Sequence, residues 1–81
     1  MSASTKLIPK YIDTSAGRAE ARVVPYGVSV WALVGYLKAA QGDKDRVARD
    51  YEVPREAVEA AEAYYRRNKA LIDARLAMNE E

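Results

Sequence analysis

Three closely spaced aspartates, Asp43, Asp45 and Asp50, have the chemistry best suited to holding a metal ion. Their spacing lacks the glycine and the terminal glutamate of a calcium-binding loop, so we interpret them as helix-capping and surface charges. The chain contains no histidine and no cysteine, which excludes imidazole bases, thiol nucleophiles, disulfides and the usual Cys/His zinc sites. Its four glycines are scattered and form no phosphate-binding loop. We therefore predict no catalytic residue, no metal, no cofactor and no enzymatic activity.

Basic side chains in the second half of the chain suggest another chemistry, the binding of DNA. A short helix expected over residues 44–51, a tight turn and a longer helix from Pro54 have the layout of a helix-turn-helix, whose second helix enters the major groove. The candidate DNA-binding residues on these elements are Lys44, Arg46, Arg49, Arg55 and Glu59. The alternative is that two helices joined by a short turn form a small core, with bases and interleaved aspartates on a solvated face.

Tyrosine and arginine residues further along the chain suggest a protein interface, because both residue types bury well against partners. The alternative for the Tyr-Tyr-Arg-Arg cluster is a core tyrosine, a half-exposed tyrosine and two solvated arginines. Arg75 falls within the apolar arc of the expected helix, so it pairs with a carboxylate or contacts another chain, unless the last turn is frayed. The candidate partner-binding residues are Tyr64, Tyr65, Arg66, Arg67, Leu71, Arg75, Leu76 and Met78.

These candidates must be positioned by the elements that the sequence predicts, of which the first is a small β-hairpin. We expect residues 1–5 to be disordered and residues 6–25 to form the hairpin. The apolar run of residues 7–12 is its first strand, where Pro9 excludes a central position in a sheet. Asp, Ser and Gly within residues 13–17 are typical of a turn. A hairpin of this size must pack on helices or pair with a second copy.

Three helices are expected after the hairpin, over residues 30–41, 44–51 and 54–78. In the first, Val30, Leu33, Val34 and Leu37 recur at the spacing of an amphipathic helix, and Gly35 indicates the close approach of another helix. The third would be about 37 Å long at 1.5 Å per residue, and a broad arc of it is apolar. The two shorter helices cannot cover such an arc, so we predict that residues 65–78 project and need a partner.

The chain is expected to be a single domain that is mainly α with a small N-terminal β-hairpin. More specifically, we predict a winged-helix or helix-turn-helix-like three-helix domain with a long C-terminal helix, since 81 residues leave no room for two domains. Thirteen Lys and Arg against 12 Asp and Glu give a net charge of +1, and such near-neutrality favours a homodimer or higher oligomer. The longest mostly apolar stretch, residues 28–37, is too short to cross a membrane, so we expect no membrane contact and a cytoplasmic location.

Several segments together resemble one known family. The chain resembles the bacterial domain-of-unknown-function family 433 over residues 6–76, in the succession Val28-Ser29-Val30-Trp31-Ala32-Leu33-Val34, Val47-Ala48-Arg49-Asp50-Tyr51, Pro54-Arg55-Glu56-Ala57-Val58-Glu59-Ala60-Ala61 and Tyr64-Tyr65-Arg66-Arg67. The resemblance implies a winged-helix-like or helix-turn-helix fold with an N-terminal hairpin. It also implies a protein that neutralises a PIN-like ribonuclease toxin, as VapB-type antitoxins do, and that represses its own operon. One departure is the sequence Pro25-Tyr26-Gly27, where the family often has Gly-Thr-Arg.

The leading hypothesis is therefore a dimeric, antitoxin-like protein that binds a toxin through its C-terminal helix. Leu71, Leu76 and Met78 would dock, while an arginine among Arg66, Arg67 and Arg75 pairs with acidic groups of the nuclease. PIN-type active sites are carboxylate clusters that hold a metal, so an inserted arginine competes with that metal. The alternatives are a DNA-binding transcriptional regulator without a toxin partner, and a homo-oligomeric assembly module.

Overall fold

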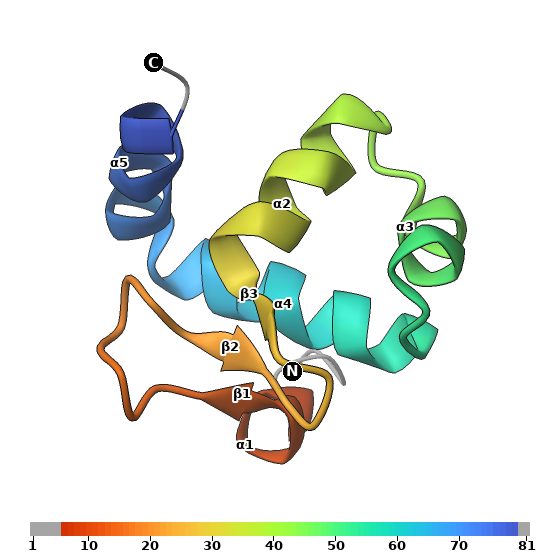
Figure 1. The fold of residues 1–81 in the computed structure, drawn as a ribbon, viewed down its shortest axis with the longest axis horizontal. Coiled ribbons are helices and arrows are strands. Elements are labelled where there is room, and N and C mark those ends of the chain that lie inside the picture. The colour runs from red at the N-terminus through yellow and green to blue at the C-terminus, as the bar shows by residue number, and fades with distance from the viewer. Residues whose placement is uncertain (1–5, 80–81) are drawn as a thin grey trace.

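The structure, a computed structural model, describes residues 6–79, so the disorder expected of residues 1–5 falls outside the described range. The described chain is mainly helical and carries one small antiparallel sheet (Figure 1). In chain order the elements are α1 (Ile8–Tyr11), β1 (Ile12–Asp13), β2 (Arg22–Val23), β3 (Val28–Ser29), α2 (Val30–Ala39), α3 (Lys44–Tyr51), α4 (Arg55–Arg67) and α5 (Lys69–Asn79).

The sheet extends the expected hairpin by one strand. Strands β1 and β2 pair antiparallel with Ile12 opposite Val23, and β3 adds to the other edge of β2 with Val28 opposite Val23. Val23 is fully buried, so the central strand ties the sheet to the helices. All three strands precede α2 in the chain.

The expectation of a strand over residues 7–12 is wrong for its first part, which forms the single-turn helix α1. Pro9 lies at the start of this turn, where its fixed φ suits a helix and its missing N–H is not needed. The turn buries Tyr11, whose hydroxyl donates a hydrogen bond of 3.2 Å to Oε1 of Glu56 on α4. The contact with α4, which is distant in the sequence, was not visible in the apolar pattern that predicted a strand.

Helices α2 and α3 lie close to their expected positions. The buried residues of α2 are the four that its amphipathic spacing predicted, Val30, Leu33, Val34 and Leu37. This helix ends at Ala39, two residues before the expected boundary, because Gln41 and Gly42 adopt positive φ values of 59° and 83°. Helix α3 has the expected bounds, and the Asp43 carboxylate caps it by accepting from the Arg46 N–H at 3.1 Å.

The single long helix expected over residues 54–78 is two helices in the structure. Asn68, with φ −131° and ψ 38°, interrupts the helical backbone between α4 and α5. An unbroken helix of about 37 Å would exceed the longest extent of the molecule, 31 Å. The chain instead turns back, and α5 packs against α2 (Figure 1).

The predicted projection of residues 65–78 is therefore corrected as well. Ile72 of α5 is fully buried, and a Cβ added to Gly35 would lie only 2.9 Å from Cδ2 of Leu76. Gly35 thus marks a close helix approach, as its position in the sequence indicated, and the approaching helix is α5. The apolar arc of α4 is also covered by this chain's own α1, α2 and α3, and α4 forms the centre of the core.

Candidate partner-binding groove

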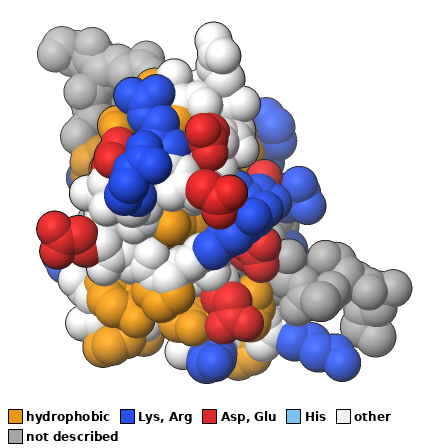
Figure 2. All heavy atoms as spheres, turned by 90° about the vertical axis from the view of Figure 1, so that its right-hand side faces the viewer, with side chains coloured by type: hydrophobic (Ala, Val, Ile, Leu, Met, Phe, Trp, Pro, Cys, Tyr) orange, Lys and Arg blue, Asp and Glu red, His pale blue; other side chains and the backbone are white. Residues whose placement is uncertain are grey.

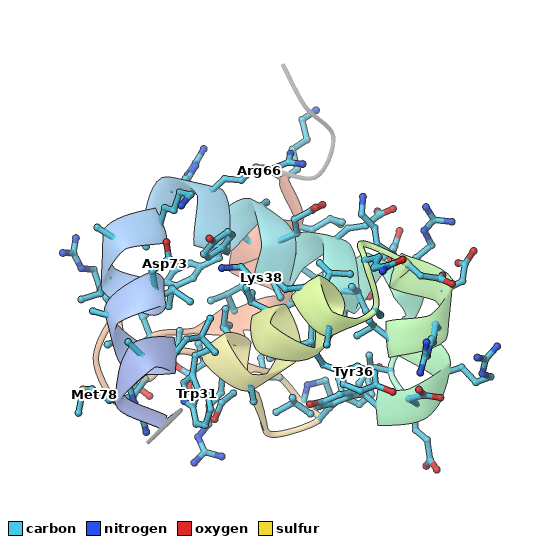
Figure 3. The ribbon with its side chains drawn as sticks, turned by 90° about the horizontal axis from the view of Figure 1, so that it is seen from above. Trp31, Tyr36, Lys38, Arg66, Asp73 and Met78 are labelled. Carbon is cyan, nitrogen blue, oxygen red and sulfur yellow. The ribbon has the colours of Figure 1, made fainter. Side chains whose placement is uncertain are left out.

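Two hollows flank Lys38 on the surface where α2 lies beside the α4–α5 corner (Figure 3). The smaller hollow, of about 240 Å³, is lined by Gly35, Lys38, Asp73, Leu76 and Ala77. The larger, of about 340 Å³, is lined by Val34, Leu37, Lys38, Gln41, Gly42, Glu62, Tyr65 and Arg66. We call these two hollows together the Lys38 groove. Its floor is apolar and its rim is charged, a combination that suits recognition of a mixed apolar and charged group.

The side chain of Asp73 organises the polar centre of the groove. Its Oδ1 accepts from Nζ of Lys38 at 3.1 Å and from the hydroxyl of Tyr65 at 2.8 Å, while its Oδ2 accepts from Nζ of Lys69 at 2.9 Å. The ammonium groups of Lys38 and Lys69 also lie 4.9 and 5.8 Å from the centroid of the Tyr65 ring. One carboxylate from α5 therefore fixes a lysine of α2, a tyrosine of α4 and a lysine of its own helix.

These contacts shift the pKa values of Asp73, Lys38 and Lys69. Hydrogen bonds from Lys69, Tyr65 and Lys38 hold the pKa of the Asp73 carboxyl well below its usual range. Tyr65 and Asp73 in turn raise the pKa of Lys38, and Asp73 raises that of Lys69. Both lysines and the aspartate therefore carry their charges at neutral pH.

A second carboxylate holds the opposite rim. Glu62 on α4 forms ion pairs with Nζ of Lys44 at 3.0 Å and with Arg66, one turn further on, at 3.4 Å. The side chains of Lys44 and Glu62 are only 27% and 22% exposed, whereas that of Arg66 is 66% exposed. Glu62 therefore anchors α3 to α4 on one side and presents the Arg66 guanidinium to solvent on the other.

Some predicted partner-binding residues stabilise the fold instead of lying free at the surface. Tyr64 is buried, and its hydroxyl donates to the backbone carbonyl of Arg18 at 2.8 Å. Arg75 pairs with a carboxylate, the first of its sequence alternatives, since its Nε donates to Oε2 of Glu20 at 2.7 Å. Its guanidinium also lies 4.4 Å from the ring centroid of Trp31. These contacts tie the loop before β2, helix α2 and helix α5 to one another.

Other predicted partner-binding residues remain accessible. Arg66 and Arg67 are exposed at the end of α4, and Met78 is 71% exposed near the end of α5. Leu71 is half-buried. Leu76 lies between these classes, because it packs against α2 and also lines the smaller hollow. The two adjacent tyrosines match the alternative interpretation from the sequence, because Tyr64 lies in the core and Tyr65 is half-exposed.

The predicted DNA-binding residues all participate in ion pairs within the chain. Besides the Lys44–Glu62 pair, Arg46 and Arg49 each lie 3.7 Å from an oxygen of Asp50. The Asp50 carboxylate also accepts from the hydroxyl of Tyr36, which lowers its pKa.

Arg55, at the start of α4, is paired twice, with Asp45 at 3.1 Å and with Glu59 at 3.3 Å. Figure 2, which views the α3 side of the molecule, shows Lys and Arg side chains interspersed with Asp and Glu. Residues 43–59 contain four bases and six acids, a formal charge of −2. The helix-turn-helix-like face is thus slightly acidic, which opposes binding to phosphates.

Sequence reasoning missed three residues that shape the groove, Lys38, Glu62 and Asp73. The signal for Lys38 was present, because it is the only charged residue of an otherwise apolar helix. Helical spacing predicts only the i,i+4 pairs of Asp73 with Lys69 and of Glu62 with Arg66, and the structure contains both pairs. Their second partners, Lys38 and Lys44, come from other helices and could not be inferred from helical spacing.

The structure places no further chemistry near the groove. Within residues 6–79, no group of His, Cys, Asp and Glu side chains is arranged to hold a metal ion. None of the described helices is both long and apolar enough to span a membrane.

In comparisons with known proteins, no family model, curated protein or solved structure matches this chain.

Proposed function

We propose that this protein is an antitoxin-like, partner-binding protein that neutralises a PIN-like ribonuclease toxin. The observation that carries the proposal is the Lys38 groove, an apolar hollow whose rim presents the exposed Arg66 beside the exposed Arg67. Residues 60–79 contain four bases and two acids, a formal charge of +2. A basic surface with an apolar hollow complements an acidic nuclease site next to apolar residues.

The proposed mechanism is steric and electrostatic. The end of α4 approaches the toxin, and Arg66 or Arg67 inserts between the metal-binding carboxylates that PIN-type active sites contain. A guanidinium makes strong paired hydrogen bonds to carboxylates, so it competes with the metal for the same ligands. The half-buried Leu71, near the start of α5, adds apolar contact at the edge of this interface, whereas the exposed Met78 lies at the far end of α5, away from Arg66 (Figure 3).

A second proposed function, repression of its own operon, rests on a different observation. Helix α3, the turn around Glu52 with its φ of 57°, and α4 follow one another as in a helix-turn-helix. This second proposal includes a winged-helix-like fold in which the three-stranded sheet is the wing. The −2 charge of residues 43–59 ranks it behind toxin binding. A cytoplasmic homodimer is the form in which both functions would operate.

Co-expression tests the first function. The protein should restore growth to cells that express the ribonuclease encoded beside its gene, and the two proteins should purify together. Replacing both exposed arginines, Arg66→Glu with Arg67→Glu, should abolish the rescue. Lys6→Glu with Arg22→Glu is the matched control, because both residues are exposed, neither lines the groove and the total change of charge is the same. Equal toxicity with and without the protein would contradict the proposal.

A promoter-binding assay tests the second function. A fragment of the operon's own promoter should be retarded at low salt, and Arg46→Ala or Arg55→Ala should weaken that binding. The absence of any shift at low salt would leave toxin binding as the only proposed role.

A further inference from the structure

We infer that the Lys38 groove recognises an acidic protein segment in which one large apolar side chain enters the larger hollow and an adjacent carboxylate meets Lys38 and Arg66. This inference rests on the proposed function and deepens it, because it names the chemistry of the partner segment. It also identifies Lys38, which the sequence did not mark as a binding residue, as a specificity determinant.

The floor of the hollow defines the apolar part of the ligand. Val34 and Leu37 are core residues, yet both line the hollow of about 340 Å³ between α2 and α4. This volume lies near the lower end of the range for ligand sites, about 300–1,000 Å³. It therefore suits a single large side chain with its adjoining backbone better than a whole helix.

The charged rim defines the acidic part. Two cations, Lys38 and Arg66, line the hollows together with the carboxylates of Glu62 and Asp73. Two further cations, Lys44 and Lys69, pair with these same carboxylates, so the cluster contains four positive charges against two negative ones. The excess of two positive charges favours an acidic group.

The two cations that line the larger hollow are also held in place before any ligand arrives. Asp73 fixes Lys38 and Glu62 fixes Arg66, while their side chains remain 51% and 66% exposed. An ammonium has three N–H donors and a guanidinium five, so each cation has capacity for another acceptor. A carboxylate that meets such prepositioned donors incurs little cost for ordering them.

A nucleic acid fits this surface less well than a protein segment does. The apolar floor offers nothing to a phosphate, and the neighbouring residues 43–59 carry a charge of −2 that repels a polyanion. A peptide with an apolar side chain beside a carboxylate uses both the floor and the rim.

The test titrates the full chain with short peptides and follows its backbone amide signals by NMR. The probe is a ten-residue peptide with one central leucine flanked by two glutamates on each side. We expect the largest shifts at Leu37, Gln41, Tyr65 and Arg66. Three matched ligands serve as controls: the same peptide with Ala for Leu, the same peptide with Lys for Glu, and a single-stranded DNA decamer.

Two variants of the full chain locate the binding. Arg66→Glu should weaken the binding of the glutamate peptide at least tenfold. Gln41→Glu, which keeps the shape of the hollow, should also weaken this binding while leaving both cations in place. Lys6→Glu, at an exposed residue that does not line the groove, should leave the affinity within about twofold. Circular dichroism of each variant confirms that it folds, so that a loss of binding reports on the groove.

Several outcomes would overturn the inference. These are no shifts at the groove, equal binding of the alanine or lysine peptide, or tighter binding of the DNA. A dimer in sedimentation that Arg66→Glu dissociates would show that a second copy occupies the groove, and it would also overturn the inference. Toxin neutralisation measured in parallel separates the two proposals. If the unaltered protein neutralises the toxin but binds no peptide at the groove, the proposed function stands and only the groove assignment is refuted.

Discussion

Replacement of Ile72 by alanine tests the packing that returns α5 to the body of the protein. Ile72 is fully buried in the core cluster, so the variant removes every side-chain carbon beyond Cβ from a closed site. Such a change costs about 2–5 kcal/mol, counting both lost burial and the cavity that remains. A small domain has only about 5–15 kcal/mol of stability in total. For a chain of this length, we expect Tm to fall by at least about 8 °C.

Two optical probes separate detachment of α5 from global unfolding. The single tryptophan, Trp31, lies on α2 with the guanidinium of Arg75 from α5 at 4.4 Å from its ring centroid. Its fluorescence therefore responds when α5 leaves, whereas far-UV circular dichroism follows the helices as a whole. In Ile72→Ala we expect the fluorescence transition at a lower temperature than the circular dichroism transition, because α5 becomes the least stable unit. In the unaltered protein the two transitions should coincide.

The matched control is Ile72→Val, which removes one methylene and should cost about 0.5–1.5 kcal/mol. If Ile72→Ala lowered Tm no more than Ile72→Val does, Ile72 would not be packed in a closed core. The folded-back position of α5 would then be refuted, and the projecting helix that the sequence suggested would be restored.

Three further perturbations probe other contacts. Asp73→Asn should destabilise the protein at neutral pH. Because the pKa of Asp73 is lower in the folded state, the ionised carboxylate contributes to folding stability above the unfolded value of 3.8, and this contribution is lost as pH falls below that value toward the folded-state pKa. The denaturant curves of variant and parent should therefore converge in acid. Gly35→Val should lower Tm by the equivalent of about 1–3 kcal/mol, since even a Cβ there lies 2.9 Å from Leu76 Cδ2, and an unchanged Tm would contradict the close approach. Tyr64→Phe should cost about 1–1.5 kcal/mol in chemical denaturation by removing the 2.8 Å hydrogen bond to the Arg18 carbonyl, and a neutral effect would argue against that bond.

Local chemistry in the sequence was sufficient to predict α3 and the buried face of α2. Asp43 caps α3, and Pro54, which precedes α4, separates the two helices in the expected place. The break at Asn68 was not predictable in the same way, because apolar periodicity continues through residues 54–78. The helix turns back to make contacts with distant parts of the chain, such as that of Leu76 with Gly35, 41 positions away.

The residues of the candidate site were likewise predictable only in part from the sequence. Tyr65 and Arg66 were predicted as binding residues from their types alone, and both line the groove. Lys38 was not predicted, because its role depends on Asp73, 35 positions later in the chain. Helical spacing identifies pairs within one helix, but a groove between helices exists only after the helices have packed.

The small net charge of the chain conceals a separation of charge that decides which partner each surface can accept. Residues 6–42 contain five bases and two acids, residues 43–59 four bases and six acids, and residues 60–79 four bases and two acids. The fold brings Lys38 from the first of these segments to the third, so Lys38 and Arg66 line one groove, while the helix-turn-helix-like face stays acidic. An acidic partner is therefore attracted to the groove and a polyanion is repelled from α3. Because α5 folds back, the partner that we propose would meet this charged groove instead of a long apolar helix, and charge complementarity would be the main source of specificity.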